Sequence, residues 1–147
     1  MSNPATPAAR RVFDAINSGD LSCLPDCVTD DFVDHGSPFP LPPGPEGYAG
    51  ILGFVHDRLQ IRYSLEDLIE TTDRIVIRAR ATGFGLAQFH GPEAAGRPYE
   101  MTTIHIYRTE GDRLAEHWGV RDELGALVRM GVVPAPEPPP LPTATAS

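Results

Sequence analysis

The chain has 147 residues, of which 41% are hydrophobic and 22% are charged, a composition typical of one folded domain. Its formal net charge of −8 argues against nucleic acid as a partner, because nucleic acid is bound by clustered positive charge. All twelve cationic residues are arginines, so Schiff-base chemistry and phosphate-loop lysines are excluded. Cys23 and Cys27 have no further Cys or His at zinc-finger spacing, and we expect no metal.

The chain ends suggest where the protein resides and where its domain stops. No apolar run reaches the roughly 18 residues of a membrane span, and the segment MSNPATPAARR lacks the apolar core of a signal peptide. We therefore expect a cytoplasmic protein that does not contact membranes. The sequence predicts one domain over residues 5–132 and a disordered, proline-rich tail over residues 133–147, which could also dock in an aromatic groove.

Two helices are predicted in the N-terminal half. The first begins at Thr6-Pro7, an N-cap followed by a first-turn proline, and ends at Asn17-Ser18-Gly19. Its apolar residues repeat at helical spacing: Ala9, Val12, Phe13 and Ile16. A short element from Asp20 to about Phe32 leads to a proline- and glycine-rich loop, and residues 46–60 have the spacing of a second helix.

The C-terminal half has the pattern of antiparallel strands. Two hairpins are predicted, the first from residues 61–71 and 74–83 and the second from residues 99–109 and 113–121. A short helix over residues 123–130 closes the domain. Helices followed by a run of hairpins indicate an α+β fold, with a curved sheet and the helices on its concave side.

The second hairpin is predicted to gather polar groups on one face. If Gly111-Asp112 forms a two-residue turn, the opposed pairs on that face are Tyr107–Glu116, His105–Trp118, Thr103–Val120 and Met101–Asp122. Polar groups among apolar neighbours are typical of a ligand pocket. A shift by one residue would instead place Ile104 opposite Trp118 and reverse the assignment.

Each of these residues also has a plain structural interpretation. The polar face could point to solvent, in which case Ile104 and Ile106 mark the core. Asp122, between a strand and a helix, could be a helix N-cap. His35 could be a surface turn residue.

Four segments together resemble the SnoaL-like polyketide cyclases: VDHGSPFPLPPGPEGYAG, DLIETTDRIVIRARATG, FHGPEAAGRPY and HIYRTEGDRLAEHWGVRDELGALVRMG. The resemblance runs from about Val12 to Gly131. It implies the cone-shaped α+β fold of nuclear transport factor 2, in which a curved, antiparallel or mixed sheet and N-terminal helices enclose a pocket. It also implies aldol-type ring closure of a polyketide without a metal or organic cofactor.

The resemblance also implies site residues. The family's acid/base aspartate corresponds to Asp122, and its pocket histidines correspond to His35 and His105. One difference is that relatives often have histidine where this chain has Gly85, while His90 follows five residues later. We further expect six substrate contacts: Tyr107, Glu116, Trp118, Tyr48, Phe13 and His90.

The expected function is therefore a cofactor-free cyclase or isomerase that acts on a small polyketide or aromatic metabolite in secondary metabolism, such as antibiotic biosynthesis. One alternative is an enzyme that opens an epoxide in the same pocket. Another is a non-catalytic module for small-molecule binding or dimerisation, since a fold does not determine a function. We expect a homodimer or higher homo-oligomer.

Overall fold

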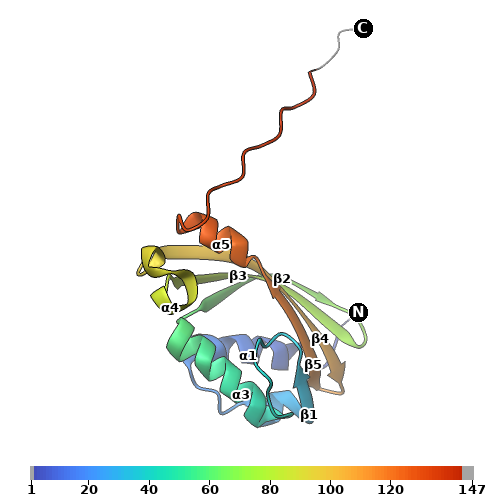
Figure 1. Cartoon of the computed structure of the whole chain (residues 1–147). Coiled ribbons are helices and arrows are strands. Elements are labelled where there is room, and N and C mark those ends of the chain that lie inside the picture. The colour runs from blue at the N-terminus through green and yellow to red at the C-terminus, as the bar shows by residue number, and fades with distance from the viewer. Residues whose placement is uncertain (1, 144–147) are drawn as a thin grey trace.

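The computed structural model describes residues 2–143, and Figure 1 shows its arrangement. The helical elements are α1 (Thr6–Ser18), α2 (Leu24–Cys27), α3 (Pro45–Phe54), a π-helical turn (Val55–Leu59), α4 (Ala87–His90), a 3₁₀ turn (Pro92–Ala94) and α5 (Glu123–Arg129). The strands are β1 (Val28–Asp34), β2 (Arg62–Glu70), β3 (Arg74–Phe84), β4 (Pro98–Glu110) and β5 (Arg113–Arg121). This is the expected α+β class.

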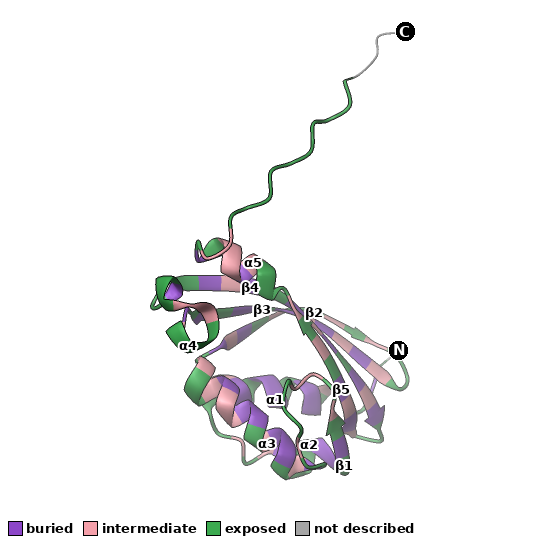
Figure 2. Cartoon of the chain, in the orientation of Figure 1, coloured by how far each residue is buried: buried purple, intermediate pink, exposed green. Residues whose placement is uncertain are grey.

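Within residues 2–143 the strands form one open, mixed sheet in the order β1-β5-β4-β3-β2. Strands β2 to β5 pair antiparallel, whereas β1 pairs parallel with β5. Helices α1 and α3 lie on one side of the curved sheet, and α4 and α5 gather where β3 ends and β4 begins (Figure 1). Buried and more exposed residues alternate along β3 and β4, so one face of the sheet lines the core (Figure 2).

Helix α1 supplies much of that core. Pro7 lies in its first turn, and Gly19 ends it with a φ of 84°, a left-handed conformation that glycine adopts without strain. Its buried face contains Ala8, Ala9, Val12, Phe13, Ala15 and Ile16. The prediction that Thr6 is the N-cap is wrong: Thr6 is the first helical residue, and its hydroxyl binds Glu70 on β2.

The structure corrects one predicted region and describes two others. The second helix leaves α-helical geometry at Val55 and ends at Gln60, whose φ is 54°. The element between Asp20 and Phe32 is a helical turn followed by β1. After residue 133 the described chain forms no helix or strand and runs away from the domain (Figure 1). The tail remains a prediction, and its last four residues lie outside the described part.

A β-bulge changes the register of the β4–β5 hairpin. Glu110 pairs with Arg113 and Thr109 with Leu114, but Arg108 already pairs with Glu116, because Ala115 is an extra residue on β5. Beyond the bulge, Ile106 therefore faces Trp118, Tyr107 faces His117, His105 faces Gly119 and Thr103 faces Arg121. The predicted pairing is thus one residue off, and the face with His105 carries His117 and Arg121 rather than Glu116 and Trp118.

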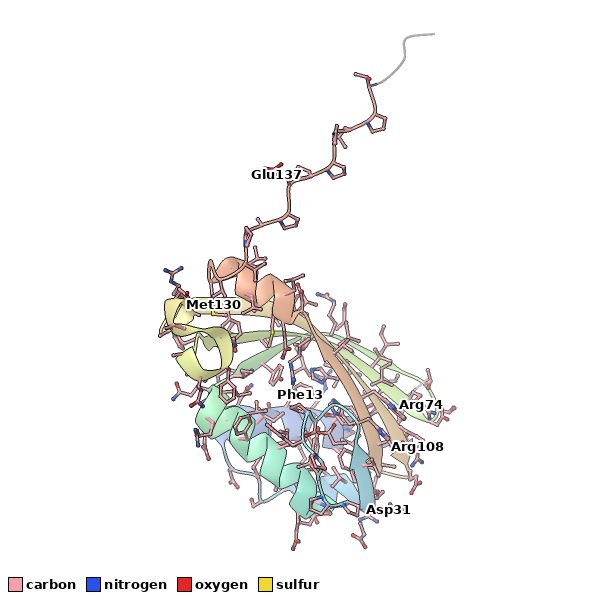
Figure 3. The ribbon with its side chains drawn as sticks, viewed as in Figure 1. Phe13, Asp31, Arg74, Arg108, Met130 and Glu137 are labelled. Carbon is pink, nitrogen blue, oxygen red and sulfur yellow. The ribbon has the colours of Figure 1, made fainter. Side chains whose placement is uncertain are left out.

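Phe13 packs α1 against the sheet, and its replacement tests this packing. Its side chain points from α1 into the interior (Figure 3) and contacts the rings of Tyr63 and His105 edge-on, with centroid distances of 5.3 and 5.0 Å. Phe13→Ala should lower the free energy of unfolding by about 3–5 kcal/mol in urea denaturation, because it removes a buried ring and leaves a cavity. Leu124→Ala, at an exposed leucine, is the control and should change it by no more than about 0.5 kcal/mol. Equal effects would contradict this packing.

Candidate functional site

The concave side of the sheet borders a cavity with two chambers. The outer chamber has a volume of about 450 Å³ and is lined mainly by apolar residues from α3, α4, β4, α5 and the connecting segments. The deep chamber, of about 60 Å³, contains Asp34, Tyr48, Tyr63, His105 and His117. The chambers adjoin where they share Pro38, Phe54, Leu59 and Arg121.

A chain of hydrogen bonds crosses the floor of the deep chamber. Asp34 Oδ1 lies 2.6 Å from His117 Nδ1, and His117 Nε2 lies 2.9 Å from His105 Nδ1. His105 Nε2 lies 2.9 Å from Thr103 Oγ1, which is 3.0 Å from the carbonyl oxygen of Ala79. The chain therefore links β1, β5, β4 and β3.

The donor and acceptor of each hydrogen bond can be assigned by starting from the carbonyl of Ala79. A carbonyl only accepts, so Thr103 donates its single proton to Ala79 and accepts from His105 Nε2–H. Burial, His117 and Arg121 lower the pKa of His105 to about 3, so its ring is neutral and Nδ1 carries a lone pair. His117 Nε2 must therefore donate to that lone pair.

One proton remains between His117 Nδ1 and Asp34 Oδ1, because two lone pairs facing each other at 2.6 Å would repel. The pair is either imidazolium with carboxylate or imidazole with carboxylic acid, and both forms have no net charge. Oδ1 also accepts the backbone N–H of Gly36. Among the described residues no hydrogen bond uses Asp34 Oδ2, so this oxygen is available to a ligand.

Tyrosines surround this chain. Tyr48 and Tyr107 join their hydroxyls at 2.7 Å, and burial raises the pKa of both well above the usual value. Tyr107 is fully buried and does not line either chamber, so it supports the site from behind. Burial also raises the pKa of Tyr63, while Arg121 beside it acts in the opposite direction.

Of the expected site residues, His105 and Tyr48 line the deep chamber and His90 lines the outer one. Phe13 lines neither chamber and packs against the His105 ring. Tyr107 also lies behind the chamber wall rather than in it.

His35, Glu116 and Trp118 lie on the outer face of the sheet. His35 Nε2 donates to Glu116 at 2.8 Å, and its ring stacks on Trp118 with a centroid distance of 5.1 Å. Arg108 also binds Glu116 at 2.6 Å, and together these partners lower the pKa of Glu116. The predicted place of these three residues in the pocket is wrong, because the bulge turns Glu116 and Trp118 outward.

Asp122 is exposed and lies at the N-cap of α5, where its Oδ1 accepts the backbone N–H of Gly125 at 2.9 Å. It lines neither chamber. Its expected place inside the pocket is therefore wrong, and the N-cap interpretation describes its position. The carboxylate that lines the deep chamber is Asp34 instead.

The loop at Gly85 has no room for a side chain, and the nearby histidine at the cavity is His90. A Cβ atom on Gly85 would lie only 1.9 Å from the carbonyl oxygen of Ala94, so no side chain fits there. His90 Nδ1 accepts the backbone N–H of Leu86 at 2.9 Å, which leaves the proton of the neutral ring on Nε2. This imidazole thus reaches the outer chamber from α4.

Three residues of the site, Asp34, His117 and Arg121, are not among those expected from the sequence. Asp34 lies next to the expected His35. The predicted register puts His117 on the face opposite His105, because it does not include the bulge. The signal that could have shown it is Leu114-Ala115, two successive apolar residues that interrupt the alternation and are both buried.

Other features of the described chain do not form a comparable site. A shallow groove of about 440 Å³ near Phe84 and Pro98 is open to solvent, and its Arg129 and Glu100 pair with each other at 3.0 Å. Among residues 2–143 no group of three or more Cys, His, Asp or Glu side chains is placed to hold a metal ion. No helix in the same range is long and apolar enough to cross a bilayer.

Comparison with known proteins finds one family. The sequence pattern of the SnoaL-like polyketide cyclases matches residues 7–129. IdmH from Streptomyces antibioticus, a proposed polyketide cyclase, is 29% identical, with a TM-score of 0.73 over 87% of this chain and 99% of its own. No curated protein matches the chain.

Two more distant structures share the fold. A SnoaL-like polyketide cyclase from Agrobacterium tumefaciens is 21% identical, with a TM-score of 0.70 over 85% of this chain and 95% of its own. AclR from Streptomyces galilaeus, a proposed hydroxylase, is 18% identical, with a TM-score of 0.70 over 89% of this chain and 87% of its own.

The lowered pKa of His105 predicts how stability depends on pH. An unfolded histidine binds a proton near pH 6.5, whereas folded His105 stays neutral down to about pH 3. The unfolded state binds more protons in this window, so acidification should lower the free energy of unfolding by up to about 1.4 kcal/mol per pH unit. Urea denaturation at pH 7, 6 and 5 should show a steeper loss for the wild type than for His105→Gln. If the free energy of unfolding falls equally in both proteins, and ¹⁵N ring shifts report a charged His105 at pH 5, the neutral state of His105 is contradicted.

Gly85 gives a second test. In Gly85→His the new Cβ would collide with the backbone at Ala94. We expect a loss of about 1–3 kcal/mol in the free energy of unfolding, since neither backbone segment can move aside cheaply. Gly50→His, at a glycine with no atom within 4 Å of a Cβ, is the matched control. An unchanged free energy of unfolding in Gly85→His would show that the loop can move to accommodate a side chain.

Proposed function

The chain belongs to the SnoaL-like polyketide cyclase family, and from this we propose that it is a cyclase or isomerase acting on a polyketide or aromatic small metabolite. The reaction is an acid/base ring closure of the aldol type. Its substrate occupies the two-chamber cavity, and Asp34 is the acid/base. The observation that carries this role is that Asp34 lines the deep chamber and keeps Oδ2 free while Oδ1 is held.

The proposed step conserves its protons. Asp34 Oδ2 takes a proton from the carbon beside a carbonyl, so that the C–H bond breaks and an enolate forms. The enolate carbon bonds to a second carbonyl carbon of the same molecule and closes the ring. The oxygen of that second carbonyl becomes an alkoxide and takes the proton back from Oδ2. A positioned acid/base of this kind contributes roughly 10²–10⁴-fold to the rate.

His117 and His105 hold Asp34 in position for this step. His117 orients Oδ1, His105 orients His117, and Thr103 sets the tautomer of His105. The apolar walls of the outer chamber exclude water and fold the substrate towards a reactive conformation. The step needs no metal or organic cofactor, and a cytoplasmic homo-oligomer acting in secondary metabolism, such as antibiotic biosynthesis, remains part of the proposal.

Two Asp-to-Asn variants test the assignment. With an aromatic β-keto ester that carries a second ketone, Asp34→Asn should lower the rate of ring closure, and of deuterium exchange at the α-carbon, by at least about 10²-fold. Asp122→Asn should keep both rates within a few-fold, because Asn caps a helix about as well as Asp. Circular dichroism and urea denaturation establish that both variants fold.

The opposite pattern, with activity lost only in Asp122→Asn, would return the acid/base role to Asp122. Activity kept in both variants would refute a carboxylate mechanism at either residue. Turnover of a racemic epoxide without cyclisation of the keto ester would identify an epoxide-opening enzyme. Binding of both probes without turnover would identify a non-catalytic binding module.

A further inference from the structure

Arg121 is a cation at the junction of the two chambers. The bulge places it opposite Thr103, on the same face of the sheet as His105 and His117, and it lines both chambers. Its side chain is 25% exposed, and its Nε lies 3.3 Å from Glu123, whose carboxylate is 68% exposed. The hydrogen bond of its Nε to Glu123 is the one that meets strict geometry among the described residues, while its guanidinium also lies close enough to the Tyr63 hydroxyl to lower the pKa of that group as a hydrogen-bond donor.

The charge of Arg121 is only partly balanced inside the cavity, because its ion-pair partner Glu123 lines the outer chamber but has a side chain that is 68% exposed. Besides Arg121, the ionisable groups that line the deep chamber are Asp34, Tyr48, Tyr63, His105 and His117, and those of the outer chamber are His90, Tyr99 and Glu123. Asp34 already shares its proton with His117, and Glu123 lies at the solvent edge. Arg121 also acts against the effect of burial on the pKa of Tyr63 and Tyr99, so its field reaches both hydroxyls.

The dimensions of the chambers restrict what can lie there. The deep chamber of about 60 Å³ has room for about four water-sized groups, which suits an acetyl group but not an aromatic ring. The outer chamber of about 450 Å³ has apolar walls from Phe39, Phe54, Ile61, Phe89, Met101 and Leu127. A ligand must therefore enter with a narrow end first and leave a bulky apolar body outside the junction.

We propose that the cavity binds an apolar, aromatic-sized molecule by one anionic oxygen group at its narrow end, with Arg121 and the Tyr63 hydroxyl holding that oxygen. The group is a carboxylate of the ligand or the enolate of a β-dicarbonyl unit, which have the same planar oxygen chemistry. A guanidinium binds such oxygens with charge-assisted hydrogen bonds, which are stronger in a low-dielectric cavity than in water. This inference rests on the cavity named in the proposed function, but it does not depend on the reaction proposed there.

Binding of small probes tests the proposal without turnover. In titration calorimetry 2-naphthoate should bind the wild type at least about tenfold more tightly than 2-naphthamide, which has the same shape without the charge. A second probe, the enolisable diketone 1,3-indanedione, carries an enolate in place of the carboxylate. Arg121→Gln should abolish the preference for the charged probes, and Arg121→Lys should restore part of it, because Lys keeps the charge but not the planar fork. Arg129→Gln, at an arginine outside the cavity, is the matched control.

The outcomes separate this proposal from the proposed function. A preference that depends on Arg121 for the carboxylate, the enolate or both supports it and identifies the source of the oxygen. Equal binding of naphthoate and naphthamide, or a preference that survives in a folded Arg121→Gln variant, overturns it. Asp34→Asn should keep the preference for naphthoate over naphthamide even though it loses turnover, because that preference depends on Arg121. A failure of the catalytic assignment would therefore leave the binding result intact.

Discussion

The hydrogen bond between Asp34 and His117 is the interaction on which the site depends. It joins the end of β1 to β5, the one parallel pair in the described sheet, and brings a carboxylate under the cavity. A buried carboxylate is costly unless its charge and lone pairs are satisfied. Here the cost is met by His117 and the N–H of Gly36, and the chain then continues through His105 and Thr103 to the sheet backbone. The acid/base group is therefore held by the fold itself.

The β-bulge decides which chemistry the last hairpin presents to the cavity. A single extra residue, Ala115, turns His117 and Arg121 inward and Glu116 and Trp118 outward. The outward residues form their own cluster with His35, in which ion pairing and stacking replace contact with a ligand. One hairpin thus has a buried proton-sharing face and an exposed ion-paired face, because successive side chains of a strand point to opposite sides.

The electrostatics of the cavity suit the formation of an anion. The Asp34–His117 pair carries no net charge, whereas Arg121 at the junction of the chambers is positively charged and has an ion-pair partner, Glu123, that is largely exposed. Removal of a substrate proton in the deep chamber leaves negative charge on a substrate oxygen, and Arg121 lines that chamber. Charge stabilisation of this kind is strong where water is excluded. Acid/base chemistry and anion binding are therefore two uses of one cavity.

Local sequence patterns determined most of the secondary structure. The ends of α1, β2, β3, β4 and β5 lie within one or two residues of the predicted ones, because apolar periodicity and turn residues act over short stretches. His105, on a strand whose alternation is regular, lines the deep chamber. Only the tertiary structure decided that β1 joins β5, that β5 is bulged, and that Asp34 rather than Asp122 lies in the cavity. These features depend on strand pairing between distant segments, and a shift of one residue there reverses the direction of every side chain beyond it.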